Sequence, residues 1–134
     1  MRPLTLLIAL SVSTTVCSAQ DEAALHSTMK QIGPLAGGLG KKIAAKDATA
    51  SADAEKLESL FVEVRKLWEP RVAGDSSDFS KSASEQFNRA AKAITAGQWD
   101  EAAAAQKKAG ASCMGCHSAH REKAADGTYK LKKP

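Results

Sequence analysis

The sequence contains one short group of residues able to hold a redox cofactor, Cys113-Met114-Gly115-Cys116-His117. On a helix, two thiols three positions apart lie on the same face, so both can reach one edge of a flat ligand. The imidazole that follows is turned about 100° further around the helix, where its nitrogen can bind a metal held beside that edge. This spacing is the attachment pattern of c-type haem. We expect one covalently bound haem, with thioethers to Cys113 and Cys116 and His117 as an axial iron ligand.

Three other chemistries use the same residue types. A thioredoxin-like redox pair requires a β-α-β context, and no segment of this chain is typical of a strand. A structural zinc site needs four closed ligands, for which only two cysteines and three histidines are available. A disulfide between Cys113 and Cys116 would leave His117 without a role. The pattern therefore favours haem.

The N-terminal segment has the order of a secretory signal peptide. A short basic start that includes Arg2 precedes an apolar run from Leu4 to Val16, and Cys17-Ser18-Ala19 places small residues before Gln20. We expect cleavage after Ala19, so that residues 1–19 are removed and residues 20–134 form one domain. The apolar run is shorter than the roughly 20 residues of a membrane span. The expected location is the periplasm, with no stable membrane span after cleavage.

Composition gives weaker but consistent indications. The formal net charge of +4 falls by one when Arg2 leaves with the signal, and two haem propionates would reduce it further. No strong attraction to nucleic acid follows from so small a charge. Aromatic residues make up only 4% of the chain, so an Ala-rich bundle of this size is short of large side chains for its interior. A haem would supply the missing apolar volume.

Four stretches have apolar residues at helical spacing. In the first, we expect a kink at Gly33-Pro34 because the stripe keeps its phase across the break. In the second, Ser51 is the expected N-cap; a loop should then cover 69–78, and Ser80 should cap the third helix, which ends at Gly97. The fourth should stop near Gly127, before a basic tail from Thr128 to Pro134. The four stripes comprise Leu25, Met29, Ile32, Ala36, Leu39 and Ile43; Leu57, Leu60, Phe61, Val64, Leu67 and Trp68; Ala83, Phe87, Ala90 and Ile94; and Trp99, Ala103, Gln106, Gly110, Cys113, His117 and His120.

Short connections between four amphipathic helices predict an all-α, antiparallel four-helix bundle with the haem attached near the C-terminus. We interpret the alanine-rich run from Ala102 to Ala109 as a face against which something bulky can lie. At this point the chain resembles the class II c-type cytochromes, the family that includes cytochromes c′. The resemblance is carried by the attachment motif on the last helix, by Arg121 four residues after His117, and by Met29-Lys30 followed by Gly33. As a helical layout it covers essentially the whole chain after the signal.

The sixth position on the iron decides what such a protein does. The resemblance implies Met29 as the distal ligand, as in the low-spin, electron-carrying branch of the family. The methionine content supports this assignment. Of the three methionines, Met1 is cleaved off with the signal and Met114 is tethered at the porphyrin edge, which leaves Met29 as the one available ligand. The alternative is that Met29 only packs in the core, since it is in phase with Leu25 and Ile32. The family's frequent arginine four residues before the distal position is Leu25 here.

Three further polar residues need an interpretation. His26 is the rival sixth ligand, although a position at the solvated edge of the bundle fits it better. His120 is one turn beyond His117 on the same helix and cannot reach the opposite face of the iron. Arg121 is either a partner of a haem propionate or a solvated cation at a helix C-terminus.

The expected function is one-electron transfer with redox protein partners. With His117 and Met29 both bound, Fe(III) and Fe(II) would differ little in geometry. The alternative is a five-coordinate, cytochrome c′-like protein that binds small gases such as NO and CO; a weaker one is an enzyme subunit whose haem feeds a catalytic partner. No nucleophile–base pair or carboxylate dyad is evident, so we expect no enzymatic activity of the chain itself. The resemblance also implies a homodimer as one expected assembly.

Overall fold

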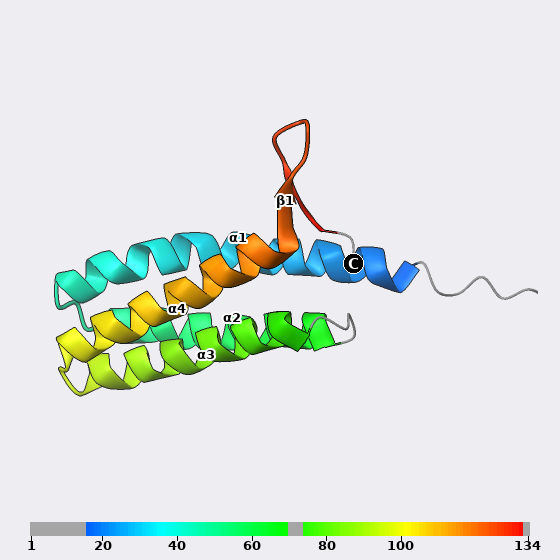
Figure 1. Cartoon of the computed structure of the whole chain (residues 1–134). Coiled ribbons are helices and arrows are strands. Elements are labelled where there is room, and N and C mark those ends of the chain that lie inside the picture. Colours follow the sequence, from blue (N-terminus) through cyan, green and yellow to red (C-terminus); the bar gives the residue numbers. More distant parts are fainter. Residues whose placement is uncertain (1–15, 70–73, 133–134) are drawn as a thin grey trace, which may run out of the picture.

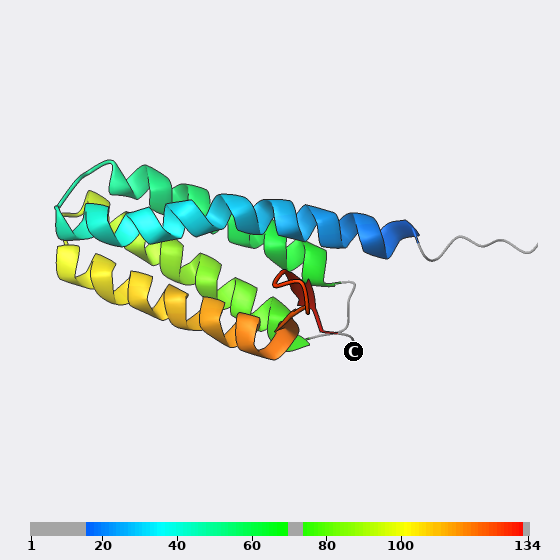
Figure 2. The same ribbon diagram turned by 90° about the horizontal axis from the view of Figure 1, so that it is seen from above.

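The computed structural model describes residues 16–69 and 74–132. Four helices follow one another: α1 (Val16–Ala44), α2 (Ala50–Trp68), α3 (Gly74–Thr95) and α4 (Trp99–His120). In Figures 1 and 2 they lie side by side, and each runs back along the one before it. The prediction of a mostly helical chain is therefore confirmed. Most of the expected signal peptide, residues 1–15, lies outside the described residues, and cleavage after Ala19 would remove the first turn of α1.

The apolar stripe of α1 faces the core as predicted. Leu25, Ile32, Leu39 and Ile43 are buried, while Met29 packs against them and is half-buried. The helix continues through Pro34 as one element, which confirms that the break does not divide it. It ends where Lys46 adopts a left-handed conformation with φ of 54°, and the amides of Lys46 and Asp47 bind carbonyls of the last turn.

The apolar face of α2 is also as predicted, with Leu57, Phe61 and Val64 fully or almost fully buried. The prediction of Ser51 as the N-cap is wrong. Ser51 lies inside the helix, and Thr49 occupies the cap position without a side-chain cap bond. The reason is that the turn before α2 is already closed: the Asp47 carboxylate accepts from the Thr49 amide at 2.8 Å, and the Asp47 carbonyl accepts from the Ala50 amide at 3.0 Å.

The helix α3 begins earlier than the sequence suggests. It starts at Gly74, so the predicted loop over 69–78 is too long, and Ser80 is an interior residue instead of a cap. The Ser80 hydroxyl donates to the carbonyl of Ser76 one turn back, at 2.9 Å, which satisfies a buried serine without interrupting the helix. The predicted face of Ala83, Phe87, Ala90 and Ile94 is buried.

The turn between α3 and α4 follows the prediction. Gly97 has a φ of +72°; its amide binds the carbonyl of Ile94, and the amide of Gln98 binds that of Ala93. These two bonds form a Schellman motif, in which the left-handed residue is usually glycine because a Cβ is disfavoured there. Gly97 thus reverses the chain so that α4 packs along α3.

The predicted stripe of α4 is only partly correct. The buried residues are Ala102, Ala105, Ala109 and Cys116, whereas Ala103 and Gly110 are exposed. The small side chains of Ala102, Ala105 and Ala109 lie in the hydrophobic core, and none of residues 102–109 lines the cavity described below. Contacts of α4 with α1 are much sparser than those with α3. Cys113 and His117 are half-buried on the side that α3 leaves uncovered.

A small hairpin follows α4, against the prediction that the helix continues toward Gly127 and ends in an unstructured tail. Strand β1 (Arg121–Lys123) pairs antiparallel with β2 (Tyr129–Leu131), with Arg121 opposite Leu131. The turn depends on Asp126, whose carboxylate accepts from the amide and hydroxyl of Thr128, and on Gly127 at φ +85°. No helix among the described residues is long and apolar enough to cross a bilayer.

Candidate cofactor cavity

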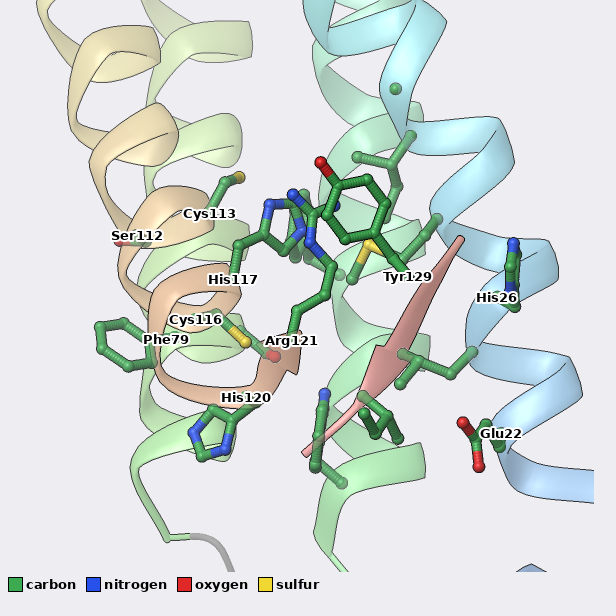
Figure 3. Close-up of a pocket in the computed structure, with 18 of the residues that line it drawn as sticks. Glu22, His26, Phe79, Ser112, Cys113, Cys116, His117, His120, Arg121 and Tyr129 are labelled. Carbon is green, nitrogen blue, oxygen red and sulfur yellow. The ribbon is translucent and has the colours of Figure 1, made fainter. Parts of the chain in front are cut away.

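A cavity of about 570 Å³ lies near the end of the bundle from which the hairpin projects (Figure 3). All four helices and the hairpin contribute to its wall. Its size falls within the usual range for small-molecule and cofactor sites, about 300–1,000 Å³. The sparse contact between α1 and α4 leaves this part of the bundle open.

Three of the five residues of the attachment motif, Cys113, Cys116 and His117, line this cavity. Cys113 and Cys116 are free thiols on consecutive turns of α4, and Cys116 is 8% exposed. His117 is half-buried, and Figure 3 shows its ring pointing from α4 into the space between α4 and α1. Because the motif lies entirely within α4, the two thiols and the imidazole have the helical spacing predicted from the sequence.

Burial sets the protonation of these groups. It raises the pKa of the Cys113 thiol, and it raises that of Cys116 to about 11, with Cys113 and Asp75 adding to the effect. Burial also lowers the pKa of His117, and the nearby Arg121 guanidinium acts in the same direction. The imidazole is therefore neutral at pH 7, which is the form that binds metals.

The two candidate distal ligands occupy different environments on α1. Met29 is half-buried, lines the cavity and packs against the hydrophobic core. His26 borders the same cavity but is exposed, and Figure 3 shows it apart from the group formed by His117, Arg121 and Tyr129. The cavity thus has a thioether on α1 and an imidazole on α4 in its wall.

Arg121 belongs to β1 and not to the fourth helix. Its guanidinium lies 4.0 Å from the centroid of the Tyr129 ring, and it lines the cavity. Among the described residues it forms no ion pair with a carboxylate, whereas the hairpin's Lys130 pairs with Glu122 at 3.3 Å. A cation without a carboxylate partner therefore borders the cavity near His117.

His120, the last residue of α4, closes one side of the cavity. Its ring packs against Trp68 with centroids 5.3 Å apart, and its Nε2 lies 3.1 Å from Oδ1 of Asp75. Neither Nε2 nor the buried Trp68 Nε1 has a partner with hydrogen-bond geometry. The structure places His120 against α2 and α3, in a packing role at the cavity wall.

Sequence reasoning missed the hairpin residues of the wall, which include Thr128, Tyr129 and Leu131. A signal for them exists: Asp126-Gly127 is a turn dipeptide, and the residues after it alternate between apolar and polar. Phe79 was also missed. Its ring lies against Gly115 so closely that a Cβ there would come 2.5 Å from Cε1 of the ring. No group of three or more His, Cys, Asp or Glu residues gathers as a metal site within 16–69 and 74–132.

Comparison with known proteins found no match to a protein-family model, to a curated protein or to a solved structure. The functional interpretation therefore depends on the motif and on the cavity that its residues line.

Proposed function

We propose that the chain is an exported, periplasmic monohaem c-type cytochrome that transfers single electrons between redox protein partners. Cys113 and Cys116 would attach the haem, and His117 and Met29 would be its iron ligands. The observation that carries this proposal is that all four side chains line one cavity, although Met29 comes from α1 and the others from α4. In this proposal the helices form an antiparallel bundle of the class II type.

The cavity has the properties that this cofactor requires. Two free thiols one helical turn apart can form thioethers to one edge of the ring, and a neutral imidazole suits iron. The thioether of Met29 is a soft ligand of the type found opposite histidine in c-type cytochromes. Arg121, which has no carboxylate partner among the described residues, offers a charge-assisted contact to a propionate. The residues present therefore fit the group.

Each side chain would have a defined task. The haem iron supplies one-electron chemistry between Fe(III) and Fe(II). Cys113 and Cys116 prevent loss of the cofactor, and the wall formed by Ile32, Phe61 and Trp68 excludes water from it. His117 and Met29 would hold the iron in both oxidation states, so that little reorganisation would accompany electron transfer.

The second candidate is a five-coordinate haem protein that binds small gases. One observation favours it: Met29 packs against the core cluster, in phase with the buried Leu25 and Ile32. A methionine held there by packing would leave the iron open on that side. The two candidates share the attachment residues and differ only in the role of Met29.

The deciding experiment is an electron paramagnetic resonance spectrum of the ferric mature protein, produced with the haem-attachment machinery. A low-spin signal in the wild type that becomes high-spin in Met29→Ala supports the electron carrier. Leu35→Ala is the matched control, because Leu35 is also a half-buried residue of α1 packed on the core but does not line the cavity.

The other outcomes are equally informative. A high-spin wild type that binds carbon monoxide readily supports the gas-binding protein and makes Met29 a packing residue. A low-spin signal that survives Met29→Ala but not His26→Ala makes His26 the ligand. A chain that carries no covalent haem by mass spectrometry rejects both candidates.

A further inference from the structure

The C-terminal turn of α4 carries His117, and this turn is held by a residue from outside the helix. The last four carbonyls of an α-helix lack partners within it. Here the amide of Arg121 binds the carbonyl of His117. The Lys132 ammonium donates to the carbonyl of Ser118 at 2.8 Å, and the Lys132 amide donates to that of His120 at 2.9 Å. Lys132 thus satisfies two of the four free acceptors.

The hairpin explains why Lys132 reaches this turn. Pairing of Arg121 with Leu131 brings the chain after β2 back beside the end of α4. Leu131 packs against the hydrophobic core, which fixes the residue that precedes Lys132. The turn at Asp126 and Thr128 closes the other end of the hairpin. Lys132 is therefore placed by several independent contacts.

We infer that the Lys132 side chain is a positioning group for His117: by holding the carbonyl of Ser118, its ammonium fixes the turn of α4 from which the imidazole projects. The backbone amide of residue 132, which binds the His120 carbonyl, is kept in every substitution and so does not contribute to the difference. The inference rests on the proposed function, because it concerns the orientation of an iron ligand. The ammonium also places a positive charge at the negative end of the helix dipole. Lys132 does not line the cavity, so both effects would reach the cofactor site through α4.

The test compares Lys132→Ala with Lys132→Arg and with Lys123→Ala in the haem-loaded mature protein. Lys123→Ala removes the same charge from the same hairpin, but Lys123 has no bond to α4 carbonyls. For Lys132→Ala we expect amide exchange of Arg121 to become about tenfold faster, as for loss of a hydrogen bond that holds the turn. We also expect a lower midpoint potential and changed low-spin g-values, because the ligand plane and local charge both change.

Lys132→Arg should restore the exchange rate and the g-values, since it keeps a cationic donor. Equal potentials and unchanged g-values in Lys132→Ala and Lys123→Ala would overturn the inference while leaving the electron carrier intact. A mature chain without covalent haem would reject the proposed function, and the role toward iron with it. Circular dichroism of each variant establishes that it is folded.

Discussion

The Arg121 guanidinium rests on the face of the Tyr129 ring, 4.0 Å from its centroid, and so joins the first strand of the hairpin to the second above the cavity. The two residues are diagonal neighbours, since Arg121 pairs with Leu131 and Tyr129 with Lys123. The aromatic face attracts the cation electrostatically. This contact holds Arg121 beside the cavity in the absence of a carboxylate partner among the described residues.

Removing the ring should loosen the hairpin. For Tyr129→Leu we expect the hairpin's local free energy of opening to fall by about 0.5–1 kcal/mol, because Tyr129 is 51% exposed and solvated cation–π contacts are weak. Amide exchange of Ala124, which donates to Thr128 across the turn, measures the opening. Tyr129→Phe keeps the ring face and should behave as wild type. If Tyr129→Phe lowers the free energy of opening as much as Tyr129→Leu does, the hydroxyl group of Tyr129 and not its ring face holds Arg121.

A side chain at Gly115 of the attachment motif should be poorly tolerated. A methyl group on Gly115 would lie 2.5 Å from Cε1 and 2.9 Å from Cζ of Phe79. Such a clash costs about 1–3 kcal/mol, whereas replacing a helix-interior glycine by alanine gains about 1 kcal/mol, so Gly115→Ala should lower the free energy of unfolding by at most about 2 kcal/mol in urea titrations. Phe79→Ala removes the obstacle, and the double variant should therefore be more stable than the sum of the two single effects predicts. Additive effects would contradict the contact.

The thiols of the haem-free chain should react slowly and with a marked pH dependence. Burial raises the pKa of Cys116 from 9.0 to about 11, so at pH 8 its thiolate fraction should be about a hundredfold lower than in the unfolded chain. Alkylation of the reduced wild-type chain, with and without denaturant and with Cys113 and Cys116 quantified separately by tandem mass spectrometry, measures this ratio. The neutral thiol is favoured in the folded chain. Its contribution to stability is therefore complete below pH 9 and is lost between pH 9 and 11. Equal alkylation rates with and without denaturant would show that Cys116 is not buried.

The core between α2 and α3 should be the most sensitive part of the bundle. The rings of Phe61 and Phe87 stack with centroids 5.5 Å apart, and Phe87 is 1% exposed. Truncation of such a residue leaves a cavity, so Phe87→Ala should cost about 3–5 kcal/mol of unfolding free energy. Val62→Ala on the exposed side of α2 is the control and should change it by less than about 0.5 kcal/mol. A small effect of Phe87→Ala would mean that this core collapses around the gap.

The spacing of apolar residues was enough to predict the buried faces of α1, α2 and α3. Large apolar residues such as Leu39, Phe61 and Phe87 lie on a single face of an amphipathic helix, and that face must be the buried one. The turn at Gly97 was predictable for a local reason, the left-handed conformation that it adopts. The face of α4 was not. An alanine side chain has little apolar surface, so the spacing of alanines along the sequence does not show which of them are buried. Tertiary packing buries Ala102 and Ala105 and leaves Ala103 exposed.

The helix boundaries and the hairpin depend on interactions that composition does not reveal. Ser80 resembles a cap in sequence, yet a bond to the carbonyl of Ser76 makes it compatible with a helix interior. Arg121 continues a helical pattern in sequence but adopts φ −117° and ψ 136°, because its strand pairs with residues that follow Gly127. Cys113, Cys116 and His117 were the easiest part of the site to identify, because covalent chemistry fixes their spacing. The wall that Tyr129 and Leu131 add to the cavity required the tertiary structure.

The sparse contact between α1 and α4 has a consequence for how such a protein would mature. The helix that contributes Met29 and the helix that contributes His117 have much less direct packing between them than α2 has with α3 or α3 with α4. If both side chains bind one iron atom, this ligation connects α1 to α4 where direct packing between them is sparse. The bundle would then reach its full stability only with the cofactor bound. Haem attachment would then also stabilise the fold, so that a haem-loaded chain would resist proteolysis better than a haem-free one.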